Sequence, residues 1–194
     1  MRSRNIDTEN SLAVWVKPAA AARVWPPYGA RTEGDNMKKQ EKTNVMRLLD
    51  QQGLPYAVHD YSHTDALSGA EVASVLGQDP ERVFKTLVTV GRSGQHYVFV
   101  IPVLRELDLK KAAAASGEKS IAMVKSKELL PLTGYIHGGC SPIGMKKPFP
   151  TFLEESAILF DAILFSAGKI GWQVELAPED LARIVPFQYA DLCE

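Results

Sequence analysis

Residues 83–90 form a run of alternating side chains that is apolar on both faces. Because side chains alternate across a β-strand, Val83 and Leu87 share one face with Lys85, while Val88 lies on the other. Apolar residues on both faces predict a central strand that is covered on each side. Lys85 is the exception, and the strand alone favours a lysine that reaches water along its four-carbon stem. The other interpretation is a lysine held in a pocket by an anionic or carbonyl partner, where desolvation lowers its pKa.

The rest of the chain predicts short helices and strands without regular alternation. Helices are expected where apolar residues recur at helical spacing between start and stop signals, at 41–52, 68–76, 108–116, 126–132 and 178–184. Strands are expected where short apolar or alternating runs lie between turn residues, at 55–61, 83–90, 95–103, 120–124, 149–153, 162–167, 172–176 and 187–192. Hairpins mixed with scattered helices predict an α+β fold with a mixed, barrel-like sheet surrounded by helices.

The first 36 residues have a different pattern from the rest. They contain prolines, an alanine run and scattered charges, whereas the residues from Met37 onward look like an ordinary protein start. We expect 1–36 to be a disordered extension or a mis-called start, and 37–194 to be the single domain. Trp15 and Trp25 leave a functional arm as the alternative.

Composition restricts the classes of protein and of partner. The chain of 194 residues has a net charge of −1, so nucleic-acid binding would need a local basic patch. Its two cysteines, Cys140 and Cys193, lie in no CxxC pattern and are too few for a disulfide scaffold, which indicates a reducing compartment. No apolar run approaches the ~20 residues that span a bilayer. We therefore expect a cytoplasmic protein with no membrane partner.

The residues that could carry metal or nucleophilic chemistry do not form a known motif. The histidines have no zinc-site spacing, so we expect neither a metal nor a cofactor; they are His59, His63, His96 and His137. Ser141 and Ser166 lack the G-x-S-x-G context of a serine hydrolase. Cys140 lies near His137, and a thiol nucleophile there stays open as a minority interpretation.

A glycine-rich loop covers residues 138–144. Its glycines at positions 138, 139 and 144 allow positive φ and a close backbone approach to a ligand, and Pro142 stiffens it. Lys146 and Lys147 follow, although the spacing differs from that of a P-loop. Two interpretations remain open, namely a rigid loop whose N–H groups bind oxygen atoms and a tight structural turn.

Several blocks of the chain resemble the YbaK/EbsC family. They occur in the family's order at residues 83–87, 107–111, 134–144, 166–171 and 174–181. The resemblance covers nearly all of 37–194 and leaves 1–36 outside. It implies a mixed sheet or barrel with helices around it, and the activity of a free-standing aminoacyl-tRNA editing protein, related to a domain inserted in some prolyl-tRNA synthetases.

The resemblance also implies a substrate and a mechanism. The implied substrate is cysteinyl-tRNA(Pro), with alanyl-tRNA(Pro) as the alternative, and the partners are the aminoacylated 3′ end of tRNA and prolyl-tRNA synthetase. Neither a metal nor a protein nucleophile is implied, because the substrate's own thiol attacks the ester and leaves as a thiolactone. A non-catalytic module that binds tRNA or a synthetase is the alternative from another class. Its surface would come from solvated lysines, namely Lys38, Lys39, Lys42, Lys110, Lys111, Lys146 and Lys147.

The family's functional positions fall on particular residues of this chain. Lys85 matches an essential lysine, which reverses the interpretation drawn from its strand alone, and Gly138 matches the loop glycine whose backbone contacts the substrate. Tyr61 and Ser166 match pocket residues. Further substrate contacts are expected from the neighbours of these positions, namely Thr86, Gly139, Ser141 and Pro142.

Gln173 stands where related sequences can carry an aspartate. A glutamine donates and accepts hydrogen bonds but cannot act as a base. The substitution argues against a carboxylate role at this position and leaves recognition of the substrate's amino group by Gln173 open. It also leaves open whether cysteine is the edited amino acid.

Overall fold

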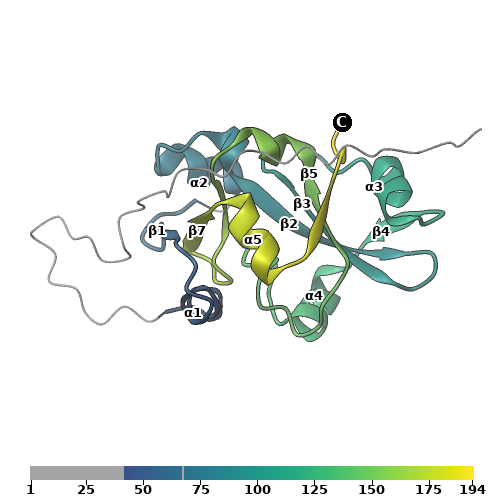
Figure 1. Ribbon diagram of the computed structural model, residues 1–194, viewed down its shortest axis with the longest axis horizontal. Coiled ribbons are helices and arrows are strands. Elements are labelled where there is room, and N and C mark those ends of the chain that lie inside the picture. Colours follow the sequence, from purple (N-terminus) through teal and green to yellow (C-terminus); the bar gives the residue numbers. More distant parts are fainter. Residues whose placement is uncertain (1–41, 67) are drawn as a thin grey trace, which may run out of the picture.

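The computed structural model describes residues 42–66 and 68–194, so the prediction for residues 1–36 lies outside the described residues. The helices are α1 (Asn44–Gln51), α2 (Gly69–Val75), α3 (Leu109–Ser116), α4 (Ser126–Thr133) and α5 (Pro178–Ile184). The strands are β1 (Ala57–Asp60), β2 (Phe84–Gly91), β3 (His96–Pro102), β4 (Ile121–Met123), β5 (Thr151–Glu154), β6 (Ile163–Ser166), β7 (Trp172–Leu176) and β8 (Phe187–Ala190). This mixture confirms the predicted α+β class (Figure 1).

The strands form two sheets rather than one closed barrel. The larger has five strands in the order β4-β2-β3-β5-β8, with parallel pairing from β3 through β5 to β8. The smaller is antiparallel and has the order β1-β7-β6. An isolated parallel bridge between Val83 and Leu164 connects them. The predicted barrel-like character is limited to this connection, because β2 and β6 separate after one bridge.

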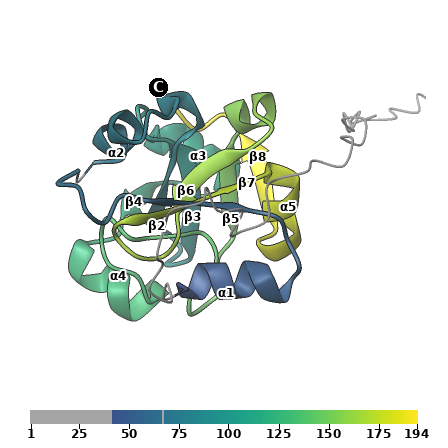
Figure 2. The same cartoon turned by 90° about the vertical axis from the view of Figure 1, so that its left-hand side faces the viewer.

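The main hydrophobic core lies between the two sheets. Val88 and Val100 of the large sheet belong to the same buried cluster as Phe165 and Val174 of the small one. Figure 2 shows β6 and β7 lying across β2 and β3, with α1 beside them. Residues of α1, including Leu49, complete this cluster.

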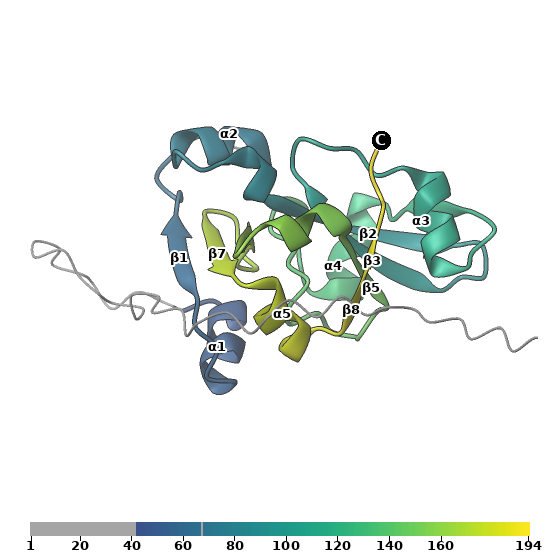
Figure 3. The ribbon, with the colours of Figure 1, turned by 45° about the horizontal axis from the view of Figure 1, so that its top comes forward.

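A second core covers the other face of the large sheet. It contains Phe99 and Ile101 of β3, Ala112 of α3 and Leu192 near the C-terminus. Figure 3 shows α3 beside β2 and β3, at the end of the molecule opposite β1. The prediction that β2 is a central strand covered on both faces is therefore confirmed.

The helices expected at 68–76 and 108–116 begin at capping residues, as their sequences predict. Ser68 and Glu71 make a reciprocal capping box at α2, and Asp108 accepts the first free N–H groups of α3. The 3-10 helix Glu155–Leu159 was not predicted, because five residues are too few to show a helical period. In the described part of the chain, no helix has the length and apolarity needed to cross a membrane.

Candidate active site

The candidate site is a cavity at the point where β6 separates from β2. The bridge from Val83 to Leu164 is parallel, so the same register would place Lys85 opposite Ser166 two residues further on. The two strands separate before they reach that pair. A cavity of about 270 Å³ opens here, and both Lys85 and Ser166 line it.

The edge of β2 that faces this opening carries backbone polar groups. The Val83 carbonyl accepts from Val103 on the β3 side, whereas the Val88 carbonyl accepts from Val124 on the β4 side. Because neighbouring residues of a strand point their N–H and C=O groups in opposite directions, those of Thr86 point the same way as those of Val88. β4 pairs only with residues 89–91, so the Thr86 backbone faces the opening.

The structure brings together six of the nine predicted site residues. The cavity is lined by Tyr61, Lys85, Thr86, Gly138, Ser166 and Gln173. Gly139, Ser141 and Pro142 are not among its lining residues. Ser141 is fully buried, and its hydroxyl accepts the Ile143 N–H at 3.4 Å, so it lies within the loop.

Ser166 and Gln173 lie directly opposite each other in the β6–β7 pair. Gln173 is 5% exposed, and its Oε1 atom is buried with no hydrogen-bond partner. The Thr86 hydroxyl is also buried without a partner. A buried polar atom that lacks a partner costs about 1–3 kcal/mol, so two such atoms in one cavity indicate a place where a polar ligand binds.

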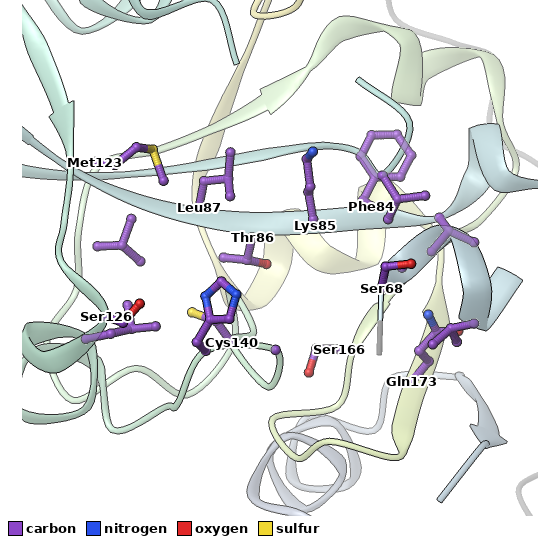
Figure 4. A pocket seen from close by; sticks show the side chains of 18 of the residues that line it. Ser68, Phe84, Lys85, Thr86, Leu87, Met123, Ser126, Cys140, Ser166 and Gln173 are labelled. Carbon is purple, nitrogen blue, oxygen red and sulfur yellow. The ribbon is translucent and has the colours of Figure 1, made fainter. Parts of the chain in front are cut away.

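The ammonium group of Lys85 has a partner outside this polar set. Its Nζ donates to Oε1 of Glu106 at 3.0 Å, and the two side chains are 28% and 82% exposed. Figure 4 shows the ammonium on the other side of β2 from Thr86 and directed away from Ser166. An ion pair with so exposed a partner is worth about 0–1 kcal/mol, so the lysine can leave it at little cost.

The glycine-rich loop is held by Tyr135. The Tyr135 hydroxyl donates to the Ile143 carbonyl at 2.6 Å, and burial raises the pKa of this phenol to about 12. A Cβ on Gly144, where φ is +76°, would lie 2.9 Å from the same hydroxyl oxygen. At the cavity Gly138 has φ +82°, a conformation that a residue with a Cβ rarely adopts. The loop is therefore a packed structural turn that also presents Gly138 to the cavity.

Cys140 lines the cavity as a thiol, not as a thiolate. The residue is 8% exposed, and burial raises its pKa to about 12. A nucleophilic cysteine needs a lowered pKa, so this environment argues against the thiol-nucleophile interpretation. Among the described residues that line the cavity, none carries a carboxylate. Across residues 42–66 and 68–194, no group of three or more His, Cys, Asp or Glu is placed to hold a metal ion.

Sequence reasoning missed several lining residues. Ser68 was expected only as a helix cap, and His137 as a solvated or structural histidine or as a partner of Cys140, yet both line the cavity together with Met123 and Ser126. The last two lie at the β4–α4 junction, where no motif marked them. Only the long-range pairing of β2 with β4 could have placed this junction beside Thr86.

Comparison with known proteins points to one family. The model of the aminoacyl-tRNA editing domain family matches residues 63–184. The proposed Cys-tRNA(Pro)/Cys-tRNA(Cys) deacylase EbsC of Enterococcus faecalis is 51% identical over 156 residues, which cover 80% of this chain and 95% of that protein. A proline–tRNA ligase of Thermosipho melanesiensis is 37% identical over 76 residues, which are 39% of this chain and 13% of the ligase.

The fold leads to the same family. The crystal structure of a proposed trans-editing enzyme for prolyl-tRNA synthetase superposes with a TM-score of 0.70 at 27% identity, over 77% of this chain and 94% of that one. The family match spans more than half of the chain and includes β2, the glycine-rich loop and the β6–β7 pair, which together form the cavity. This chain therefore belongs to the aminoacyl-tRNA editing domain family.

Proposed function

We propose that the protein is a trans-editing deacylase that removes the amino acid from misacylated tRNA, with cysteinyl-tRNA(Pro) as its substrate. The name of the Enterococcus relative supports this substrate, because that relative matches most of both chains. The proposal includes the aminoacylated 3′ end of tRNA as the partner. The match to a segment of a proline–tRNA ligase supports a link to prolyl-tRNA synthetase.

The observation that carries the proposal is the content of the cavity. Its lining includes Lys85, whose ion pair with Glu106 is exposed, and the unpartnered buried oxygen atoms of Thr86 and Gln173. Its volume of about 270 Å³ is slightly below the range of about 300–1,000 Å³ found for sites that enclose drug-sized ligands. We expect the aminoacyl group of the substrate to occupy this space.

Editing also explains why a small cavity is useful. A synthetase pocket for proline cannot reject amino acids of similar size by binding alone, since a methylene is worth only about 1–3 kcal/mol. A second site that admits the wrong amino acid and hydrolyses its ester supplies the missing discrimination. A small cavity suits such a second site, because it limits which aminoacyl groups enter.

The chemistry needs positioning and charge stabilisation more than a protein nucleophile. In the proposed reaction the substrate's thiol sulfur attacks the ester carbonyl carbon, the C–S bond forms, and the C–O bond to the ribose breaks. The thiol proton ends on the ribose oxygen, and the amino acid leaves as a cyclic thiolactone. An attacking group held within the same molecule has an effective molarity of about 10⁵–10⁸ M, so the reaction can proceed without a catalytic cysteine or serine.

Lys85 would stabilise the negative charge that develops on the carbonyl oxygen. To do so its ammonium must leave Glu106 and turn into the cavity, where the Thr86 N–H is a second donor. Removing one donor to such an oxyanion lowers kcat by about 10²–10³-fold in well-studied enzymes. We expect Lys85→Ala to lose activity by a factor of this size.

The test is single-turnover deacylation of cysteinyl-, alanyl- and seryl-tRNA(Pro). Wild type, Lys85→Ala and the control Lys110→Ala, on the surface of α3, are compared, and the released amino acid is analysed for thiolactone. We expect fast release from cysteinyl-tRNA by wild type and the control, thiolactone as the product, and a loss of about 10²–10³-fold in Lys85→Ala.

Three outcomes would contradict parts of the proposal. Full activity in Lys85→Ala would remove the role of the lysine, and fast release of alanine would replace cysteine as the substrate. Intact tRNA binding with no hydrolysis of any ester would favour the non-catalytic module instead.

A further inference from the structure

The cavity is small compared with the sites that enclose drug-sized ligands. Its volume of about 270 Å³ lies below the range of about 300–1,000 Å³ for such sites, so we expect part of the tRNA 3′ end to lie at the surface next to the opening. The net charge of −1 provides no overall attraction for a polyanion, so the surface next to the opening has to supply it.

Three lysines lie within three positions of cavity-lining residues, in two separate segments of the chain. Lys125 lies between the cavity-lining residues Val124 and Ser126, and Lys127 follows Ser126 in α4. In the other segment Lys169 lies in the turn between β6 and β7, three positions after Ser166. All three are exposed, and within the described residues no salt bridge involves them.

Three other lysines are held in ion pairs, whereas three more have no salt bridge within the described residues either, namely Lys110, Lys119 and Lys147. The ammonium groups of Lys42, Lys85 and Lys111 each lie within 3.0 Å of a carboxylate oxygen. Free ammonium groups in two segments next to cavity-lining residues suit a chain of phosphates that passes the opening.

Ile136 and Ile170 form an exposed apolar ledge next to Gly138, which lines the cavity. Ile136 and Ile170 are 52% and 46% exposed. Both side chains come within 4 Å of the position that a Cβ would occupy on Gly139, so both lie over the glycine-rich loop. Ile170 also contacts the corresponding position on Gly138, which lines the cavity. The ledge therefore adjoins the cavity and offers an exposed apolar surface to a nucleobase.

We propose that this rim, defined as Lys125, Lys127, Lys169, Ile136 and Ile170, binds the single-stranded 3′ end of the tRNA. The terminal base lies on the two isoleucines, and the lysines bind the phosphates before it. The inference rests on the proposed function, since it takes the aminoacyl group of the same substrate to occupy the cavity. The rim shares no lysine with the surface that the sequence predicts for a non-catalytic tRNA-binding module.

The test measures binding of uncharged tRNA as a function of salt. The rim variant Lys125→Ala/Lys127→Ala/Lys169→Ala is compared with wild type and with Arg92→Ala/Lys110→Ala/Lys119→Ala. The control removes the same three charges from exposed positions that do not line the cavity.

Each contact with a phosphate of a single strand adds about 0.7 to the slope of log affinity against log salt, so the rim variant should lose about 2 from this slope. From about 50 to 200 mM salt the wild type should therefore lose roughly twentyfold more affinity than the rim variant. The control should keep the wild-type slope.

A second readout separates this inference from the proposed function. Hydrolysis of a small cysteinyl ester without tRNA tests the cavity alone and should proceed equally in wild type and the rim variant. Failure of the proposed function would appear as no hydrolysis by wild type, while the salt series would still decide on the rim. Equal slopes in the rim variant and the wild type, or an equal loss in the control, would overturn the inference.

The isoleucine ledge is tested by Ile170→Ser in the same assay. This change keeps the charge and should weaken tRNA binding while leaving the salt slope unchanged. Unaltered affinity would show that the base does not lie on the ledge.

Discussion

The pairing of Lys85 with Glu106 makes a specific prediction about rate. The ammonium donates to Glu106 at 3.0 Å and is directed away from Ser166, so the proposed chemistry requires that this ion pair break. Glu106→Gln removes the charge that holds the lysine and keeps the shape of the side chain. If the pair competes with the substrate, the variant should deacylate faster than wild type.

The size of the effect follows from exposure. Glu106 is 82% exposed, and an ion pair at the surface is worth about 0–1 kcal/mol. Because about 1.4 kcal/mol corresponds to a factor of ten, the gain in kcat/KM should be at most about fivefold. The free energy of unfolding should change by less than about 1 kcal/mol for the same reason.

The assay is hydrolysis of a small cysteinyl ester, which avoids the salt dependence of tRNA binding. Salt screens exposed charges over about 8–10 Å at physiological ionic strength, so the wild-type rate should rise with salt toward that of Glu106→Gln. Glu179→Gln, at an exposed position on α5, removes an equal charge and should match wild type. A slower Glu106→Gln would refute the reasoning and show that Glu106 holds the lysine in its working position.

Three further predictions concern the scaffold and the thiols. The pKa of Glu175 is lowered chiefly by its hydrogen bond with His59. The carboxylate therefore contributes its full stabilisation above the ordinary pKa of 4.5 and loses it as the pH falls through the lower folded pKa. Glu175→Gln should flatten the decline of the urea unfolding midpoint over this acid range. Burial raises the pKa of both Cys140 and Cys193 to about 12. Mass spectrometry after iodoacetamide treatment at about pH 8 should therefore find both thiols unmodified in the folded protein and alkylated in denaturant. Phe165 is fully buried between the sheets, so Phe165→Ala should lower the free energy of unfolding by about 3–5 kcal/mol, and a loss below about 1 kcal/mol in a urea titration would contradict this packing.

The local elements could be predicted because their causes are local. The capping residues Ser68 and Asp108 fix where two helices begin, and the alternation of apolar residues around Val88 identifies a strand covered on both faces. These signals need only a few neighbouring residues, and the structure confirms them.

The assembly of the cavity could not be predicted in the same way. Nothing near Val83 indicates that it pairs with Leu164, so the division into two sheets and the opening between them depend on long-range pairing. The family resemblance identified Lys85, Ser166 and Gln173 as site positions, but it could not show that the lysine lies on Glu106. That contact depends on the loop after β3, whose path no periodicity determines.

The isolated bridge between Val83 and Leu164 has a consequence for folding. The walls of the cavity come from segments far apart in sequence, and closing such a long loop is slow relative to forming hairpins such as β2–β3. A nascent or partly refolded chain can therefore hold the complete β2–β3 hairpin, with Lys85 in place, and still lack a binding site. Recovery of deacylation during refolding should accordingly lag behind recovery of secondary structure, which makes activity a reporter of sheet docking.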